Sequence, residues 1–410
     1  MKIVLSLFLI ALSFLSAVAK TDHNKLQKEI LDYFTRTGHI TDSLRSTRDY
    51  AAIVVELNRG IEYANSIPNE FEPQRAQIKA ELYYNLACYL ALLDNTTKAA
   101  EALDSAYTCG YSNYQLMQSD NDLASMRQHP EYNRILQLLK DKYDYVRILR
   151  NAAPYHKNMR ADAIGRFAYL PSSDPDLIRV REYFRLDSVA GNGDEISRIK
   201  NILTHIHNTI KHDGEHGNPP EMNSIALAEA CKDGSRGLNC RGLATVLNEC
   251  YLAMGFPSRF ITCMPKDYIS DCHVINAVYS RQRGKWLWMD PTNNAWVMDE
   301  NGNELGIDEV RQRIIDNRPL QLNEEANWNN TSKTTAEHYL YYYMAKNLYY
   351  LQSYTVYGFD TEGDNIKGNR YISLCPAGYT PDTRGYGTIT TDNVWFWEAP
   401  SPTDLNRQAR

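Results

Sequence analysis

The hydrophobic residues of this 410-residue chain change their spacing at Gly255, from a helical period to the period of strands. Residues 24–145 read as consecutive amphipathic helices, and residues 194–211 as one further helix. After Gly255, the runs 259–264, 273–279 and 285–289 have strand character, and short turns separate them. The chain is therefore predicted to be α+β, with an all-α N-terminal domain followed by an α+β core that contains an antiparallel sheet.

The clearest helical unit lies between Ala80 and Tyr111, where two helical patterns are separated by Asp94-Asn95. This large-small-large spacing resembles a tetratricopeptide repeat, in which two antiparallel helices pack closely. An ordinary helical hairpin is the alternative, because the motif has low specificity. A repeat module of this kind implies a surface that binds a protein partner. The positions that carry the pattern are Tyr83, Leu86, Ala87, Leu90, Ala99, Leu103 and Ala106.

The first 19 residues have the pattern of a signal peptide. Lys2 precedes an apolar run from Ile3 to Leu15, and Ala17-Val18-Ala19 supplies a cleavage site. The run is too short for a membrane span, which takes about 20 residues. We therefore expect an exported protein, periplasmic or secreted, that is cleaved near Ala19. Loss of Lys2 changes the formal charge from −6 to −7, and no basic face indicates nucleic-acid binding.

Proline-rich, weakly periodic sequence after residue 150 indicates a domain boundary. We predict a helical domain at 20–150, a linker at 151–192, a core at 193–320 and an aromatic-rich region at 321–410. The last region holds many of the 29 tyrosines and ends in Trp395-Phe396-Trp397. Aromatic residues at this density form either a packing layer or a substrate groove, and packing is the favoured interpretation because of the area they bury.

Cys240 stands where a thiol is readily ionised. Asn239 is a good N-cap, and the apolar residues that follow, from Leu243 to Met254, have helical spacing. The first turn of a helix favours negative charge, which lowers the pKa of a cysteine placed there. Its free amides also suit the oxyanion of an acyl-transfer reaction. Taken alone, Cys240 would more often be a buried structural thiol.

His273 and Asp290 are predicted to meet at one end of a β-hairpin. His273 begins the second strand, and Asp290 ends the third, directly before Pro291. The short turn at 281–284 makes these strands antiparallel neighbours, so the two side chains lie alongside each other. A carboxylate in that place holds the imidazole so that its other nitrogen meets the thiol. The order is cysteine, histidine, aspartate, with spacings of 33 and 17 residues.

These three motifs resemble the transglutaminase-like superfamily: Asn239-Cys240-Arg241-Gly242, Asp271-Cys272-His273-Val274 and Trp288-Met289-Asp290-Pro291-Thr292. The resemblance covers roughly residues 190–310. It implies a papain-like fold in which Cys240 is the nucleophile, His273 the base and Asp290 the residue that orients it. It also implies a thioester intermediate formed with an amide of a peptide or protein substrate, without a cofactor. Hydrolysis and acyl transfer both remain open.

The resemblance implies a second oxyanion donor upstream of the nucleophile, which is often Trp or Gln. Neither residue occurs between positions 190 and 239, so His207, Asn208 and His212 are the candidates that remain. A catalytically silent scaffold that binds proteins or peptides through its helical module is the alternative to an enzyme. A disulfide from Cys240 to Cys272 or Cys231 would silence the thiol.

No metal site is predicted. The eight cysteines contain no C-x-x-C pair, and the histidines near His205-x-His207 lack a completing carboxylate or cysteine. Residues 299–304 resemble a calcium loop loosely, but Glu304 stands where glycine is needed. Asn301-Gly302 instead predicts a hairpin turn between Val297 and Leu305.

Overall fold

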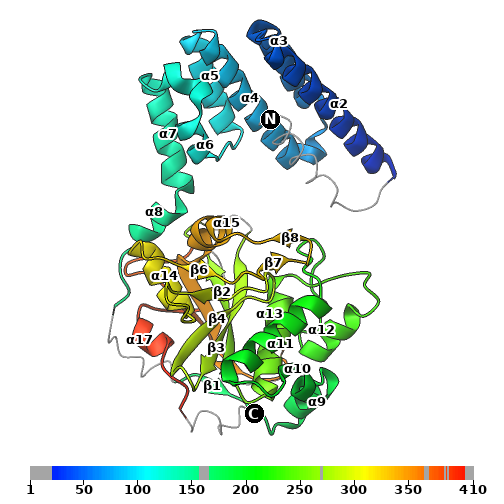
Figure 1. Cartoon of the computed structure of the whole chain (residues 1–410), viewed down its shortest axis with the longest axis vertical. Coiled ribbons are helices and arrows are strands. Elements are labelled where there is room, and N and C mark those ends of the chain that lie inside the picture. Colours follow the sequence, from blue (N-terminus) through cyan, green and yellow to red (C-terminus); the bar gives the residue numbers. More distant parts are fainter. Residues whose placement is uncertain are drawn as a thin grey trace. The chain divides into compact units, whose positions relative to one another are not determined.

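The computed structural model of the chain describes residues 21–156, 166–267, 271–363, 369–382, 385 and 387–401, with side chains described from residue 25 onward. The chain divides into two compact units, residues 1–144 and 145–410 (Figure 1). Each unit has its own hydrophobic core. The expected signal peptide lies outside the described residues.

The first unit is built of helices in which consecutive long helices pack in pairs. α4 and α5 form the hairpin predicted from the sequence. Asp94 adopts a left-handed conformation at the turn, with φ of 55°, and the Asn95 side chain caps α5 by accepting a hydrogen bond from the Lys98 amide. This arrangement is compatible with a helical repeat. The helices are α2 Thr21–Ser46, α3 Tyr50–Ser66, α4 Glu72–Leu92, α5 Thr96–Thr108, α6 Tyr114–Ser119 and α7 Pro130–Tyr143.

Close approach of α3 and α4 holds this first core together. Leu57 and Leu82 are fully buried between these helices. Gly60 of α3 faces the Leu82 side chain so closely that a Cβ atom there would lie 3.3 Å from Leu82 Cδ2. The absent side chain at Gly60 therefore lets the two helices approach.

The second unit is organised around a six-stranded sheet in the order β12-β11-β9-β2-β3-β4. All neighbouring strands are antiparallel except β11 and β12, which are parallel. The three predicted strands 259–264, 273–279 and 285–289 are confirmed as β2, β3 and β4, and region 321–410 supplies the other three. The strands are β2 Ser258–Met264, β3 His273–Ser280, β4 Lys285–Met289, β9 Tyr350–Tyr354, β11 Tyr371–Leu374 and β12 Thr388–Thr390.

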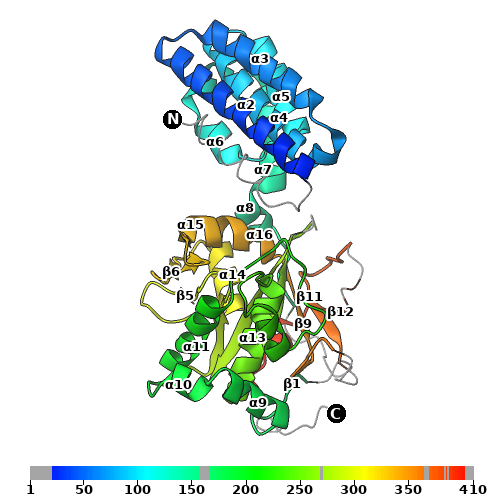
Figure 2. The same cartoon turned by 90° about the vertical axis from the view of Figure 1, so that its right-hand side faces the viewer.

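Two helices, α11 (Glu195–Thr209) and α13 (Cys240–Ala253), cover the sheet on the side that Figure 2 presents in front. α13 is buried along almost its whole length and packs directly on β2 and β3. Asn276 of β3 donates a hydrogen bond of 2.9 Å from its side chain to the Ala244 carbonyl of α13. This contact fixes the start of α13 against the strand that carries His273.

The remaining helices of the second unit are short. α9 and α10 lie in the segment predicted to be a linker of weak periodicity. Asp174 caps α9 with its side chain, and Pro175 occupies the first turn. These two residues mark the start of the helix, which is too short for its apolar residues to show a helical period. These helices are α8 Tyr145–Arg150, α9 Pro175–Tyr183, α10 Leu186–Ala190, α12 Ser224–Ala230, α14 Ile307–Ile315, α15 Ala336–His338, α16 Ala345–Asn347 and α17 Asn393–Phe396.

Paired two-residue strands complete this unit. The predicted turn at Asn301-Gly302 exists, with Gly302 at a positive φ of 81°. It belongs to a five-residue loop rather than to a two-residue turn, because Met298 pairs with Glu304. The pairs are β1 Ala168–Tyr169 with β10 Val356–Tyr357, β5 Val297–Met298 with β6 Gln321–Leu322, and β7 Asn327–Trp328 with β8 Ser332–Lys333.

The aromatic residues near the C-terminus mostly form a packing layer. Two of them enclose the guanidinium of Arg259, whose Cζ lies 5.4 Å from the Phe396 ring centroid and 5.1 Å from that of Trp397. The rings of Phe167 and Trp286 lie on the same guanidinium, each at 4.2 Å. Arg259 also donates a hydrogen bond of 2.9 Å to the Phe396 carbonyl. Because Arg259 is fully buried on β2, these contacts attach α17 to the sheet.

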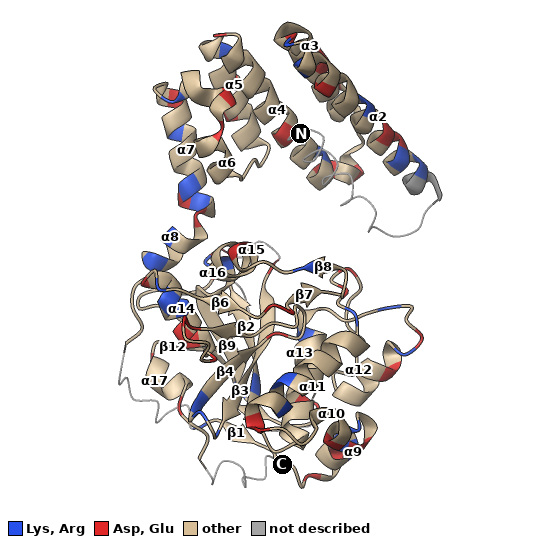
Figure 3. Ribbon diagram, in the orientation of Figure 1, with Lys and Arg blue, Asp and Glu red and all other residues tan. Residues whose placement is uncertain are grey.

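The tyrosine-rich stretch 339–350 does not form a single regular helix. α15 leads into a π-helix at Tyr339–Met344 and then α16, and Tyr350 already belongs to β9. No helix among the described residues is long and apolar enough to cross a membrane. Lys and Arg are interspersed with Asp and Glu along the helices of both units (Figure 3).

We predict that Leu82→Ala lowers the free energy of unfolding of the first unit by about 2–5 kcal/mol, because it leaves a cavity between α3 and α4. Val55→Ala is the matched control, since Val55 lies on α3 with 52% of its surface exposed. Hydrogen exchange of the 25–144 amides in increasing urea would measure both. Equal protection in the two variants would contradict the described packing.

Candidate active site

Cys240 lies at the first residue of α13, as the sequence predicts. The Asn239 side chain caps the helix by accepting hydrogen bonds from the amides of Arg241 and Gly242. Gly242 permits the segment around Asn218 to reach the helix start, because a Cβ there would lie 2.8 Å from Asn218 Oδ1. Cys240 is partly buried, so its thiol sits at the positive end of a helix with some access to solvent.

His273 begins β3 and Asp290 directly follows β4. The register pairs Asn276 with Met289, which brings the start of one strand beside the end of the other. His273 Nε2 lies 2.8 Å from Asp290 Oδ2, and both side chains are almost fully buried. Since Nε2 is engaged by the carboxylate, Nδ1 is the ring nitrogen left to interact with the Cys240 thiol, an interaction that raises the pKa of His273.

The Asp290 carboxylate is surrounded by hydrogen-bond donors. Besides His273, Oδ2 accepts from the Tyr339 hydroxyl at 2.6 Å and from the Asn293 side chain at 3.0 Å. Oδ1 accepts from the amides of Thr292 at 2.8 Å and Asn293 at 3.4 Å. Burial alone would raise the pKa of Asp290, but the charge of His273 and these hydrogen bonds outweigh it and lower the pKa.

The same interactions favour charge separation between histidine and thiol. Burial would lower the pKa of His273, yet the charge and hydrogen bond of Asp290 raise it to about 10. Burial would raise the pKa of Cys240, but its hydrogen bond to His273, the positive charge of that ring and the amide of Val274 lower it. The arrangement therefore favours a thiolate beside an imidazolium.

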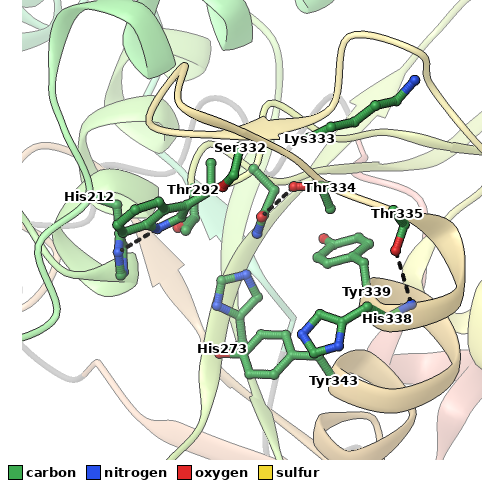
Figure 4. A pocket seen from close by; sticks show the side chains of 12 residues that line it. His212, His273, Thr292, Ser332, Lys333, Thr334, Thr335, His338, Tyr339 and Tyr343 are labelled. Atoms are coloured by element: carbon green, nitrogen blue, oxygen red, sulfur yellow. Dashed lines mark hydrogen bonds between the residues drawn. The ribbon is translucent and has the colours of Figure 1, made fainter. Parts of the chain in front are cut away.

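A cavity of about 440 Å³ opens beside His273. Figure 4 shows its lining, to which the π-helix, the β7–β8 hairpin and the loop after Asp290 all contribute. Among the described residues that line it, Lys333 is the only Lys or Arg, and there is no carboxylate. The lining residues are His212, His273, Thr292, Asn293, Trp328, Ser332, Lys333, Thr334, Thr335, His338, Tyr339 and Tyr343.

The π-helix presents two tyrosines to Asp290 and His273. Tyr339 reaches Asp290, and the Tyr343 ring meets His273 edge-on with centroids 5.2 Å apart. π-helical turns are rare and often occur at functional sites. Neither role was predicted from the sequence. The cluster of tyrosines was visible in the sequence, and residues 339 and 343 share one face of a helix, but the sequence does not show which part of the chain that face contacts.

The three candidates for a second oxyanion donor lie in different surroundings. His207 is buried, with Nδ1 2.9 Å from the Pro291 carbonyl and Nε2 3.0 Å from Asn327 Oδ1, so it supports the loop after Asp290. Asn208 accepts a hydrogen bond from the exposed Asn330 side chain. Of the three, only His212 lines the cavity beside His273.

In the described part of the chain, the other thiols and histidines form no second cluster of this kind. All eight cysteines are free, including Cys231 and Cys272. Among the residues that the structure describes, no group of three or more His, Cys, Asp or Glu side chains could hold a metal ion. In contrast with Cys240, burial raises the pKa of Cys231, and it raises that of Cys272 to about 11.

The sequence around these residues matches a known protein family. Residues 184–291 match the model of the transglutaminase-like superfamily. The chain contains a transglutaminase-like domain. The match includes Cys240, His273 and Asp290 and ends before the β7–β8 hairpin and the π-helix. We found no match to the chain among curated proteins or among solved structures.

We predict that Tyr339→Phe lowers the free energy of unfolding by about 1–3 kcal/mol, because the Asp290 carboxylate loses a buried donor and the Trp288 indole loses its acceptor. The pKa of Asp290 should also rise, since the lost bond favours its charged form. Urea unfolding at several pH values measures both effects. Tyr341→Phe on the same π-helix is the control, as Tyr341 is exposed; equal stability of the two variants would contradict this assignment.

Proposed function

We propose that the second unit is a cysteine-dependent enzyme that acts on amide bonds of peptides or proteins, as a hydrolase or an acyl transferase. The observation that supports this most strongly is the fully buried Asp290 carboxylate bonded to His273, whose ring in turn interacts with the Cys240 thiol. A histidine and a thiol that serve only packing do not need a buried charge to orient the ring, because burying that charge costs free energy.

In the proposed reaction, the Cys240 thiolate attacks the carbonyl carbon of the amide and the carbonyl electron pair moves to oxygen. As this intermediate collapses, His273 gives its Nδ1 proton to the departing amine nitrogen, and the carbon–nitrogen bond breaks. A thioester to Cys240 remains. Neutral His273 then takes a proton from water or from an amine, which attacks the thioester and releases Cys240 as the thiolate.

Water as the second nucleophile gives hydrolysis, and an amine gives transfer. We favour hydrolysis, since the cavity is lined by hydroxyl, amide and imidazole groups that accommodate water. We also propose that the protein is exported, on the strength of the signal-peptide pattern in residues 1–19. A protein partner for the helical unit is a further proposal, supported by a groove that α3, α4 and α5 line.

We predict that iodoacetamide alkylates Cys240 rapidly at neutral pH and that the rate falls only as the pH drops through the lowered pKa of this thiol. Asp290→Asn should slow the reaction about tenfold for each unit by which the pKa of Cys240 rises above the pH of the assay. Cys231 is the internal control, since it is also partly exposed but its pKa is raised. Mass spectrometry of the alkylated peptides follows both thiols.

Two outcomes would count against an enzyme. Alkylation of Cys240 no faster than that of Cys231 would remove the nucleophile and favour a catalytically silent scaffold. A reactive Cys240 that cleaves no member of a peptide library, with or without an added amine, would contradict amide chemistry. Products found only when the amine is present would assign the protein to acyl transfer.

A further inference from the structure

The attack on an amide places negative charge on the carbonyl oxygen, and hydrogen-bond donors near Cys240 must stabilise it. The first turn of α13 offers fewer donors than a free helix start. The Asn239 side chain already accepts from the amides of Arg241, at 3.0 Å, and Gly242, at 3.2 Å. Within the described residues, only the amide of Cys240 itself remains unbonded in this first turn. A second donor has to come from another part of the chain.

His212 is held next to the segment that leads into Cys240. The Leu238 amide donates to the Lys211 carbonyl at 3.0 Å, and the Asp213 amide donates to the Leu238 carbonyl at 2.7 Å. His212 therefore pairs with Leu238, two residues before the nucleophile. From the other side, the Asn329 side chain accepts from the His212 amide at 2.7 Å and donates to its carbonyl at 2.9 Å.

The tautomer of His212 follows from its contact with Trp328. The indole Nε1 can only donate, and it lies 3.2 Å from His212 Nδ1. Nδ1 is thus an acceptor, and the proton of the neutral ring is on Nε2. No acceptor bonds Nε2 in the part of the chain that the structure describes. Trp328 lines the same cavity as His212 and His273, and Figure 4 shows the two histidines in its lining.

The ring also stays neutral over the relevant pH range. Burial and the positive charge of His273 lower the pKa of His212 to about 4. Asp290 and Asp213 oppose this shift without reversing it. A neutral imidazole keeps Nδ1 available for Trp328 and does not neutralise the thiolate. It can still donate from Nε2 to an oxygen that gains charge, as a neutral histidine does in other electrophilic sites.

We propose that His212 is the second donor of the oxyanion hole, with its Nε2–H beside the amide of Cys240, and that Trp328 and Asn329 are its positioning residues. This inference rests on the proposed function of Cys240. His212 donates a hydrogen bond and transfers no proton, so the proton balance of the reaction remains with His273.

Two probes of Cys240 separate this role from that of the nucleophile. Acylation by p-nitrophenyl acetate passes through an oxyanion and releases p-nitrophenolate, whereas alkylation by iodoacetamide forms no oxyanion. For His212→Ala in the full chain, we expect acylation to slow about 100- to 1000-fold while alkylation stays within about twofold of wild type. Spontaneous hydrolysis is subtracted with Cys240→Ala.

Three further variants test whether the side-chain donor at position 212 is what speeds acylation. His212→Gln retains a side-chain donor and should recover part of the acylation rate. Trp328→Phe should slow acylation more than alkylation, because it releases Nδ1. His205→Ala is the control, since His205 is a partly exposed histidine of α11 that lies outside the lining of this cavity.

Acylation at the wild-type rate in His212→Ala, with Cys240 still alkylated rapidly, would overturn the role of His212 and leave the proposed function intact. Parallel loss of acylation and alkylation would also overturn it, because the residue would then serve the thiolate or the fold. A wild-type Cys240 that reacts with neither probe would overturn the proposed function and this inference together.

Discussion

The fully buried carboxylate of Asp290 constrains the whole second unit. An ionised group in a protein interior is costly unless donors surround it, and here both oxygens are satisfied. The donors come from the start of β3, from the loop directly after β4 and from the π-helix some 49 residues further along the chain. The sheet, the loop and the π-helix must therefore all be in place before the charge is tolerated. Folding and preparation of the site depend on the same hydrogen bonds.

The negative charge of Asp290 acts on the thiol of Cys240 through His273. Asp290 holds a proton on His273, and the resulting positive charge, together with the helix start, stabilises the Cys240 thiolate. The pKa of His273 is raised in the folded state, so the stability it contributes is complete below pH ~6.5 and lost as the pH rises through about 10. For Asp290 the pKa is lowered, and its contribution is lost as the pH falls through that value.

Much of the fold, and the positions of Cys240, His273 and Asp290 in it, could be predicted from short sequence patterns. An N-cap before an apolar period defines α13, and alternation with short turns defines β2 to β4, so Cys240, His273 and Asp290 could be placed at element ends. The residues that surround these three side chains could not be predicted in this way. Trp328 contacts His212 across 116 residues, and such pairings follow from tertiary packing rather than from a period. The π-helix could not be predicted for a related reason, since its turn departs from the 3.6-residue period by which helices are recognised in a sequence.

The central claim is that Cys240 and His273 form a thiolate–imidazolium pair. The difference in ultraviolet thiolate absorbance between wild type and Cys240→Ser, recorded across pH, tests it most directly. The structure predicts a thiolate signal at neutral pH that disappears only on acidification below the usual cysteine range. A signal that appears only as the pH rises through about 8.5, the ordinary cysteine pKa, would contradict the account.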